Sequence, residues 1–503
     1  MLRTPGRIAL LLLLASPLSA QFEYSLELDT ESRTWHVEGR FANPGGREVH
    51  YWFARWTPGA YHVADFGRFV HELSATDGAG KALAVERVDD AEFVIAANGA
   101  ENIVVSYEAD SISSGVVSHG AVIDVESNRI RDEYAYVTPV SLFGFVAQRT
   151  QEPFSLRVRL PEGWKTGTAL RQDDEGIYHA KSFERFEDSP LFFSPELHTV
   201  KTEAGGKELF VSVHGKSGNQ LEQQVEDCVR IAEGAIALMG GAPYESYHFL
   251  IGYVAEGSGS GLEHSDSTLI LTGAQARPES IRGLVAHEFF HLWCAERIHV
   301  EGIRKPDFTQ RFETSTIWVN ECMTEYMSQH VLLQAGMLSR EEFFREVGPN
   351  ARIDQMAARL GAPVEVSLQA ASWESMRDLG AFAAKMYQHG PRIILALDME
   401  MRRASDGERG IVDFLRHMMR EYDAVGRGFP EDGVLEILEE IAGGELDDFY
   451  ERYILGAGNP DLEKHLDTIG CTVRRDDGGA VEVLENPSAA QIHALDDFFS
   501  SGD

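Results

Sequence analysis

The stretch SIRGLVAHEFFHLWCAERI, Ser280–Ile298, contains the pentapeptide His-Glu-Phe-Phe-His and decides the fold class that we infer. Apolar residues recur around it at helical spacing, so we expect a helix that begins near Ser280. On that helix His287 and His291 lie one turn apart on one face, where two imidazoles can bind one metal ion. Glu288 follows the first histidine and can act on a water molecule at the open side of the metal. A chance match between two ordinary histidines is the alternative, and the helical pattern disfavours it.

A hydrolytic zinc site needs a third protein ligand and an open position. The metzincin spacing would require histidine and glycine where this chain has Arg297 and Cys294. The spacing of membrane-alanyl-type aminopeptidases would require glutamate where it has Gln310. Both patterns are therefore absent, and the third ligand has to come from a more distant segment.

The segment Thr314–Leu332, TSTIWVNECMTEYMSQHVL, predicts a second helix that carries Glu321 and Glu325 four residues apart. We expect Glu321 to be the third ligand and Glu325 to receive the N–H of a ligand histidine, since both lie on one helix face. Glu325 could instead be an exposed helical carboxylate. Three other polar residues lack a matching helical partner and are weaker candidates: Glu296, His299 and Glu313. The sequence thus predicts one zinc ion per chain, although another divalent ion would also suit these ligands.

Composition limits the classes of function. The chain has 503 residues, 43% of them hydrophobic, and can bury a large core in two or three domains. Its formal net charge of −35 repels phosphate backbones and anionic lipid, so nucleic-acid and membrane-surface functions are disfavoured. A solvated acidic surface that aids solubility is the simpler interpretation of this charge.

Residues 1–20 have the pattern of a secretory signal peptide. Arg3 and Arg7 precede the apolar run IALLLLLASPLSA, which is too short to span a membrane and ends in small residues. We expect cleavage after Ala20 and a periplasmic or secreted mature protein. No later apolar run is long enough to predict a membrane span.

The order of predicted elements indicates a multidomain α+β fold. Residues 21–203 show period-two patches separated by turns, which predict an antiparallel, β-sandwich-like domain. Residues 204–335 combine a helical stretch, a short buried strand and the two helices of the metal site. Residues 336–478 are helical in pattern, and residues 479–503 read as a short polar tail.

HEFFHLW followed by WVNECMTEY resembles the glycyl aminopeptidase family of metallopeptidases, M61, a branch of the glutamate-liganded zincins. Other stretches resemble further blocks of that family in the same order: Trp56–Val70 (WTPGAYHVADFGRFV), Asp188–Phe193 (DSPLFF), Gly259–Ser267 (GSGLEHSDS) and Lys385–Arg403 (KMYQHGPRIILALDMEMRR). The resemblance implies an N-terminal β-rich domain, a thermolysin-like catalytic domain and an all-α C-terminal domain. It also implies a zinc aminopeptidase for peptides with a small first residue, glycine or alanine.

Three further residues acquire roles. The resemblance aligns Tyr387 with a tyrosine that stabilises the oxyanion in related zinc aminopeptidases; from its spacing alone it could equally be a core residue. The glycine-rich segment around Gly261 follows a buried strand and can let a peptide substrate pair with it as an added strand. Glu263 would then meet the substrate's α-ammonium group. We interpret His264 as a turn residue rather than a metal ligand.

The chain departs from the family pattern in three respects. Many members end in a PDZ-like domain, and we expect none here because too few residues follow the helical region. Cys322 stands where relatives usually have glycine after the third ligand. Cys294 follows His291 by three residues, so the two cysteines lie just past metal ligands on converging helices, and we hypothesise a disulfide between them.

Two other functions compete with a zinc aminopeptidase. One is a catalytically inactive relative that binds peptides or proteins through the β-rich domain. The other is a zinc endopeptidase on the same scaffold. The inactive relative is disfavoured because a binding module would not need all five of the intact residues His287, Glu288, His291, Glu321 and Tyr387. Oligomeric state is not predicted.

Overall fold

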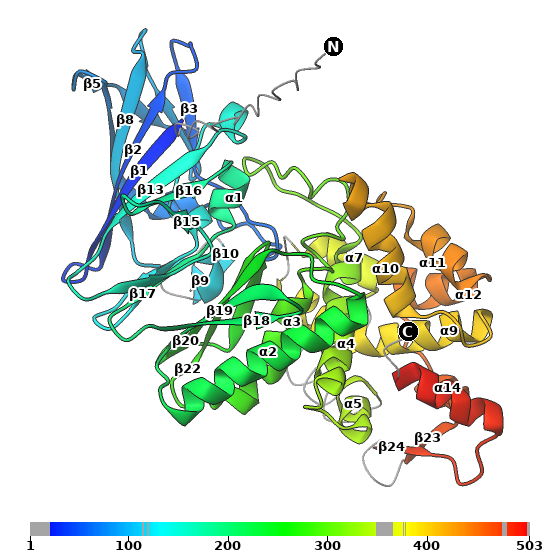
Figure 1. Cartoon of the computed structure of the whole chain (residues 1–503). Coiled ribbons are helices and arrows are strands. Elements are labelled where there is room, and N and C mark those ends of the chain that lie inside the picture. The colour runs from blue at the N-terminus through cyan, green and yellow to red at the C-terminus, as the bar shows by residue number, and fades with distance from the viewer. Residues whose placement is uncertain are drawn as a thin grey trace, which may run out of the picture.

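A computed structural model describes the chain at residues 21–112, 115–117, 120–348, 366–375, 377, 379–474 and 480–499. The predicted signal peptide, residues 1–20, lies outside these ranges. Along the chain, a region of strands is followed by a mixed region and then by a mostly helical one (Figure 1). No helix in the described ranges combines the length and the apolar character needed to cross a bilayer.

The N-terminal region consists of strands and short helical turns. Its strands are β1 (Phe22–Asp29), β2 (Thr34–Ala42), β3 (Val49–Trp52), β4 (Val70–Asp77), β5 (Ala82–Leu83), β6 (Val85–Arg87), β7 (Glu92–Ile95), β8 (Asn102–Asp110), β9 (Gly115–Val117), β10 (Gly120–Val122), β11 (Asn128–Ile130), β12 (Ala135–Val137), β13 (Phe154–Arg159), β14 (Lys165–Gly167), β15 (Arg171–Gln172), β16 (Ile177–Ala180) and β17 (Leu191–Ser194). Its helical turns are η1 (Phe66–Phe69), η2 (Asp124–Glu126), η3 (Pro139–Ser141), η4 (Ala147–Arg149) and α1 (Phe183–Glu187).

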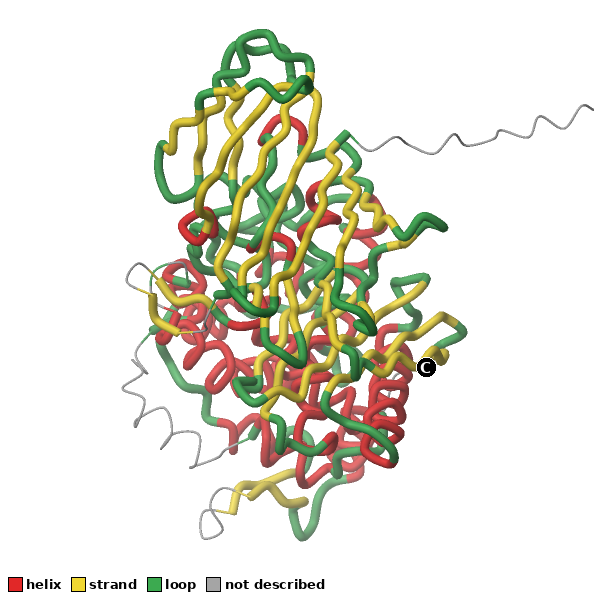
Figure 2. The backbone as a smooth tube through the Cα atoms, turned by 90° about the vertical axis from the view of Figure 1, so that its left-hand side faces the viewer, coloured by secondary structure: helices red, strands yellow, loops and turns green. Residues whose placement is uncertain are grey.

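Four sheets organise this region within the described residues, the smallest of which pairs β9 with β10. The largest runs β15-β16-β13-β1-β2-β8-β4-β5, and the others run β11-β12-β17-β14 and β3-β7-β6. Figure 2 shows the long strands side by side above the helices of the remaining chain. The β-rich N-terminal region that the sequence predicts is therefore present.

Alternating burial explains why these segments form strands. In β1, Phe22, Tyr24 and Leu26 are buried whereas Glu23 and Glu27 are exposed, so one face of the sheet joins the core. β1 pairs with β13 in parallel, which differs from the antiparallel arrangement that we expected. A parallel pair needs a long crossover connection instead of a hairpin, and residue periodicity does not reveal strand direction.

The second region combines a sheet with helices. Its elements are β18 (His198–Ala204), β19 (Lys207–His214), α2 (Asn219–Met239), β20 (Ser246–Val254), β21 (Ser260–His264), β22 (Ser267–Gly273), η5 (Pro278–Ile281), α3 (Arg282–Phe290), α4 (Ile317–Gln334) and α5 (Arg340–Val347). The sheet order is β18-β19-β20-β22-β21, with parallel strands at the centre and antiparallel strands at both edges. Helix α3 contacts β21 and β22, and α4 packs against α2 and α3. The boundary predicted at residue 203 falls inside β18, which pairs with β19 and therefore belongs to this second region.

Helix α3 ends at Phe290, earlier than the apolar pattern suggested. Beyond Phe290 two backbone hydrogen bonds span three residues instead of four, as in a 3₁₀-helix. The N–H of Leu292 donates to Phe289 O at 3.2 Å, and that of Trp293 to Phe290 O at 3.0 Å. His291 caps the helix and keeps helical backbone angles, so its position one turn from His287 is retained.

The third region is mostly helical. It contains α7 (Leu368–Glu374), α8 (Leu379–Ala384), η6 (Lys385–His389), α9 (Gly390–Ala404), α10 (Ile411–Glu421), η7 (Asp423–Val425), α11 (Val434–Ala442), α12 (Asp447–Tyr450), η8 (Glu451–Leu455), α13 (Leu462–Asp467), β23 (Cys471–Arg474), β24 (Ala480–Val483) and α14 (Ala489–Phe499). The predicted polar tail thus includes a strand that pairs with β23 and a helix whose buried Phe498 packs against Phe343 of α5.

Candidate active site

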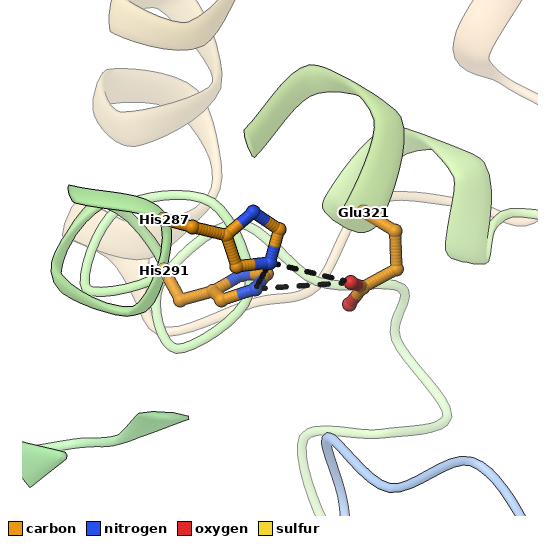
Figure 3. Close-up of side chains that lie close together, drawn as sticks. All are labelled: His287, His291 and Glu321. Atoms are coloured by element: carbon orange, nitrogen blue, oxygen red, sulfur yellow. Dashed lines mark hydrogen bonds and ion pairs between the residues drawn. The ribbon is translucent and has the colours of Figure 1, made fainter. Parts of the chain in front are cut away.

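The three predicted metal ligands lie together where α3 meets α4 (Figure 3). The Nε2 atoms of His287 and His291 are 3.0 Å apart, and Glu321 Oε2 lies 3.8 Å from each of them. All three residues are buried. Ligand atoms about 2.0–2.1 Å from a tetrahedral zinc ion are separated by roughly 3.3 Å, so this donor set fits zinc.

The hydrogen-bond partners of the two imidazoles assign their protons. His291 Nδ1 lies 3.0 Å from Cys294 O, a carbonyl oxygen that can only accept, so Nδ1 carries the proton. His287 Nδ1 lies 2.8 Å from Glu325 Oε2 in an ion-pair contact, and a carboxylate on that side of the ring favours the proton on Nδ1. Both Nε2 lone pairs are then directed at the position that a metal would occupy. Glu325 therefore lies where a carboxylate that orients a ligand histidine is needed.

Carboxylates accumulate around the two imidazoles. Burial raises the pKa of Glu321, an effect that both histidines oppose and Glu263 reinforces. Burial lowers the pKa of His287, but the hydrogen bond to Glu325 and the neighbouring carboxylates raise it to about 10 overall. Such a concentration of buried negative charge is what a divalent cation stabilises.

Glu288 lies beside the cluster and is held there by a close approach of strand β21. A Cβ added at Gly261 would lie 2.4 Å from Glu288 Cγ and 2.5 Å from its Cδ and Oε1, so only glycine fits there. Burial raises the pKa of Glu288 to about 8, with Glu263 acting in the same direction. Glu263, Glu288 and His291 each offer a ligand atom within 4.8 Å of the others.

Tyr387 reaches the cluster from the third region. It lies in η6, a π-helical turn of a kind often found at functional sites, and its hydroxyl donates a hydrogen bond to Glu321 Oε2 at 2.8 Å. Its ring centroid is 5.8 Å from that of His287. The residue is 39% exposed, so it borders open space as well as the buried ligands.

A cavity of about 780 Å³ opens onto these groups. All the predicted ligands and catalytic residues line it, together with Gly261 and Glu263. Several other lining residues carried no predicted role, among them Gly59, Ile123 and Phe382. Gly59 belongs to the Trp56–Val70 block, whose resemblance to the family was the signal that could have marked it.

The weaker candidates lie outside the metal cluster. Glu296 Oε2 accepts a hydrogen bond from Ser265 at 2.5 Å, and the Nδ1–H of His299 donates to Ala295 O at 2.9 Å. Glu313 pairs with Arg377 at 2.7 Å. In β21, His264 Nδ1 lies 3.0 Å from Asp188 Oδ1.

The predicted disulfide between Cys294 and Cys322 is wrong for this structure, in which all four cysteines of the chain are described as free thiols. The two side chains point to different neighbours: Cys294 Sγ donates to Val319 O at 3.2 Å, whereas Cys322 Sγ lies 3.4 Å from Met386 Sδ. Cys322 fills space left by Gly390, where an added Cβ would lie 2.3 Å from its sulfur. The cysteine is therefore accommodated away from the cavity.

Two histidines one turn apart, the glutamate after the first and a ligand glutamate from the next helix define a glutamate-liganded zinc peptidase. Comparison with known families agrees: the Peptidase M61 N-terminal domain matches residues 23–195, and the M61 glycyl aminopeptidase domain matches residues 280–391. Together they cover more than half of the chain, which belongs to the M61 glycyl aminopeptidase family. It is accordingly a zinc metallopeptidase of the aminopeptidase type.

Solved structures share the fold at low sequence identity. An aminopeptidase N family protein from Idiomarina loihiensis is 20% identical with a TM-score of 0.80, over 93% of this chain and 82% of that one. An M1 zinc metallopeptidase from Deinococcus radiodurans is 13% identical with a TM-score of 0.54, over 88% and 95%. A variant of an M1 zinc metallopeptidase from the same organism, bound to a Tyr-Ser-Ala substrate, is 13% identical with a TM-score of 0.53 over the same shares. A search of curated proteins found no match.

Proposed function

We propose that the protein is an exported zinc aminopeptidase that removes a small first residue, glycine or alanine, from peptides. The observation that carries the proposal is the position of Glu263, within 4.8 Å of both Glu288 and His291. An acidic group so close to the hydrolytic residues suits a substrate whose positive α-ammonium lies next to the bond to be cleaved. The family description supports the preference for glycine, and the N-terminal sequence supports export.

Glu263 favours an exopeptidase over an endopeptidase because a buried carboxylate next to the hydrolytic residues can pair with a free α-ammonium group. Glu263 is buried, and a Cβ added at Gly59 would lie 2.8 Å from its Oε1. The loop that carries Gly59 therefore packs directly against the carboxylate.

The proposed metal ligands are His287, His291 and Glu321. The chemistry that a zinc ion supplies when bound is Lewis acidity, which makes water more acidic and a carbonyl more electrophilic. Glu288 is proposed to accept a proton from the attacking water and return it to the leaving amine. Burial raises the pKa of Glu288, which makes its carboxylate a stronger base than that of an exposed glutamate.

Tyr387 is proposed to donate a hydrogen bond from its hydroxyl to the oxyanion that develops at the scissile carbonyl, in place of the one it donates here to Glu321. The hydrogen bond to Glu321 Oε2, at 2.8 Å, keeps this hydroxyl at the cluster. Since the residue is 39% exposed, its ring borders the space that a substrate would fill.

The substrate backbone is proposed to pair with β21, an edge strand in the described sheet. Gly261 has no side chain to obstruct this pairing, and its position against Glu288 brings an added strand next to the hydrolytic group. The M1 zinc metallopeptidase variant bound to Tyr-Ser-Ala provides a precedent for a peptide substrate on a similar fold.

A matched pair of substrates tests the proposal. Chromogenic amides of glycine, alanine, leucine and arginine are supplied with the amino group free or acetylated. We expect hydrolysis of the free glycine and alanine amides and none of the acetylated forms. Cleavage of internal bonds in acetylated peptides would indicate an endopeptidase, and loss of all hydrolysis with retained peptide binding would indicate a binding module.

Glu288→Gln is the control for this experiment. It replaces the proposed base by a neutral group of the same shape and leaves the three ligands in place, so turnover should disappear while zinc stays bound. Export is tested separately: the N-terminal residue of the protein recovered outside the cytoplasm should be Gln21.

A further inference from the structure

Asp124 links the N-terminal region to the strand that borders the metal cluster. Its carboxylate accepts hydrogen bonds from the hydroxyl of Ser260 at 2.7 Å and from that of Ser258 at 2.9 and 3.0 Å. The backbone N–H of Ser258 donates to it at 3.3 Å. Asp124 is 1% exposed. Among the described residues, its carboxylate oxygens accept hydrogen bonds from serine hydroxyls and a backbone N–H. A carboxylate buried in this way is stable only while these donors satisfy it.

The strand that Asp124 holds presents two different faces. Side chains alternate along β21, so Ser260 points to Asp124 while Gly261 and Glu263 lie on the opposite face. That opposite face meets Glu288, whose Cγ would lie 2.4 Å from a Cβ added at Gly261. Carboxylate oxygens of Glu288 and Glu263 lie within 4.8 Å of each other. One face of β21 is therefore anchored while the other face forms part of the active site.

Strand β21 needs such an anchor. Within the described sheet it is an edge strand that pairs only with β22, and glycines occupy positions 257, 259 and 261. Glycine gives a strand little intrinsic stability, and a slip by one residue would exchange the two faces. The contact between Asp124 and Ser260 opposes that slip, because a shift by one residue would bring a glycine instead of the serine hydroxyl to the carboxylate.

A second contact between the same two segments does not reach β21. Glu256 pairs with Arg129 at 3.2 Å, and its other carboxylate oxygen accepts from Arg131 Nε at 3.2 Å. It joins the N-terminal region to the loop ahead of the strand. A variant at Glu256 therefore weakens the interface without releasing the anchored face.

We propose that Asp124 is a positioning residue for peptide hydrolysis. By binding Ser258 and Ser260 it fixes the register of β21, so that Gly261 and Glu263 stay opposite Glu288. The inference rests on the proposed function, in which a substrate with a free α-ammonium pairs with this strand.

Kinetics of Asp124→Asn in the full-length chain provide the first test. Asparagine keeps the shape but loses the charge and presents an amide donor to two hydroxyls. For the free glycine amide we expect KM to rise more than kcat falls and kcat/KM to drop by about tenfold to a hundredfold, with zinc content unchanged. In the double variant Asp124→Asn/Ser260→Ala the loss should be little larger than in Asp124→Asn alone. The reason is that both substitutions remove the same contact, the hydrogen bond between Asp124 and Ser260.

Glu256→Gln is the matched control and should keep kcat/KM within about twofold. If Glu256→Gln loses as much kcat/KM as Asp124→Asn does, the contact of Asp124 with the two serines acts only by stabilising the interface, and the proposal is overturned. If the fall in kcat accounts for the whole loss of kcat/KM, with KM unchanged, the proposal is overturned. Denaturation of Asp124→Asn at the assay temperature would overturn it as well.

Hydrogen exchange tests the same inference without any substrate. We expect the amides of residues 260–264 to exchange faster in Asp124→Asn than in the wild type, and to be unchanged in Glu256→Gln. Unchanged exchange in Asp124→Asn overturns the proposal even if the enzyme is active. Absence of peptidase activity in the wild type would instead contradict the proposed function, and the exchange result would still decide the role of Asp124.

Discussion

Replacement of Gly261 by alanine would show whether β21 and α3 must stay as close as they are for catalysis. The added Cβ would lie 2.4 Å from Glu288 Cγ and 2.5 Å from Cδ and Oε1. Carbon atoms in contact are normally about 3.5–4.0 Å apart, so Glu288 or the strand has to move by about 1 Å. Misplacement of about 1 Å costs about a hundredfold in rate, which corresponds to about 2.7 kcal/mol of activation free energy.

We therefore expect kcat for the free glycine amide to fall by about a hundredfold in Gly261→Ala, with zinc content unchanged because no ligand is replaced. Overpacking also lowers stability by about 1–3 kcal/mol, so the assay is run well below the unfolding midpoint of the variant. Gly273→Ala is the matched control: it lies on neighbouring β22, and the nearest atom to its added Cβ is 3.9 Å away. A kcat within twofold of the wild type in Gly261→Ala would refute this reasoning.

Three further predictions follow from the site and its surroundings. Tyr387→Phe should lower kcat by about 10²–10³-fold with zinc retained, and steady-state kinetics showing an unchanged kcat would exclude Tyr387 as the oxyanion donor. Glu325→Gln should weaken zinc binding by about 10–100-fold, measured by competition with a chelator, because the proton on His287 Nδ1 loses its carboxylate; an unchanged affinity would contradict that role. Burial raises the pKa of Glu296 from 4.5 to about 8, so its protonated form stabilises the fold below pH 4.5 and that stability is lost as pH rises through 8. Glu296→Gln stays neutral and should unfold at a higher temperature than the wild type at pH 9 but not at pH 4; equal midpoints at pH 9 would contradict this.

The metal cluster could be predicted from sequence because its ligands follow local helical geometry. His287 and His291 share a face through their spacing alone, and Glu321 and Glu325 share another. Once both helices were predicted, Glu321 was favoured as the third ligand over Glu296, His299 and Glu313. The structure brings Glu321 to 3.8 Å from each imidazole, as that reasoning required.

Features that depend on how distant segments pack were not accessible in this way. Tyr387 follows Glu321 by 66 residues and reaches it from a π-helical turn, for which no spacing rule exists. Gly59 and Asp124 come from the N-terminal region, and nothing in their local sequence shows that they meet β21. The disulfide was predicted wrongly because proximity of two helix positions does not fix which way each thiol points.

Zinc content is the measurement that most directly examines the central claim, that the imidazoles of His287 in α3 and of His291 at its end form one metal site with a carboxylate of α4. The purified chain is loaded with zinc, dialysed and analysed beside Glu321→Gln and the control Glu313→Gln, whose carboxylate pairs with Arg377 instead. The account predicts about one tightly held zinc ion per chain in the wild type and the control, and a large loss in Glu321→Gln. A wild-type chain that retains no zinc, or a Glu321→Gln variant that holds it equally tightly, would contradict it.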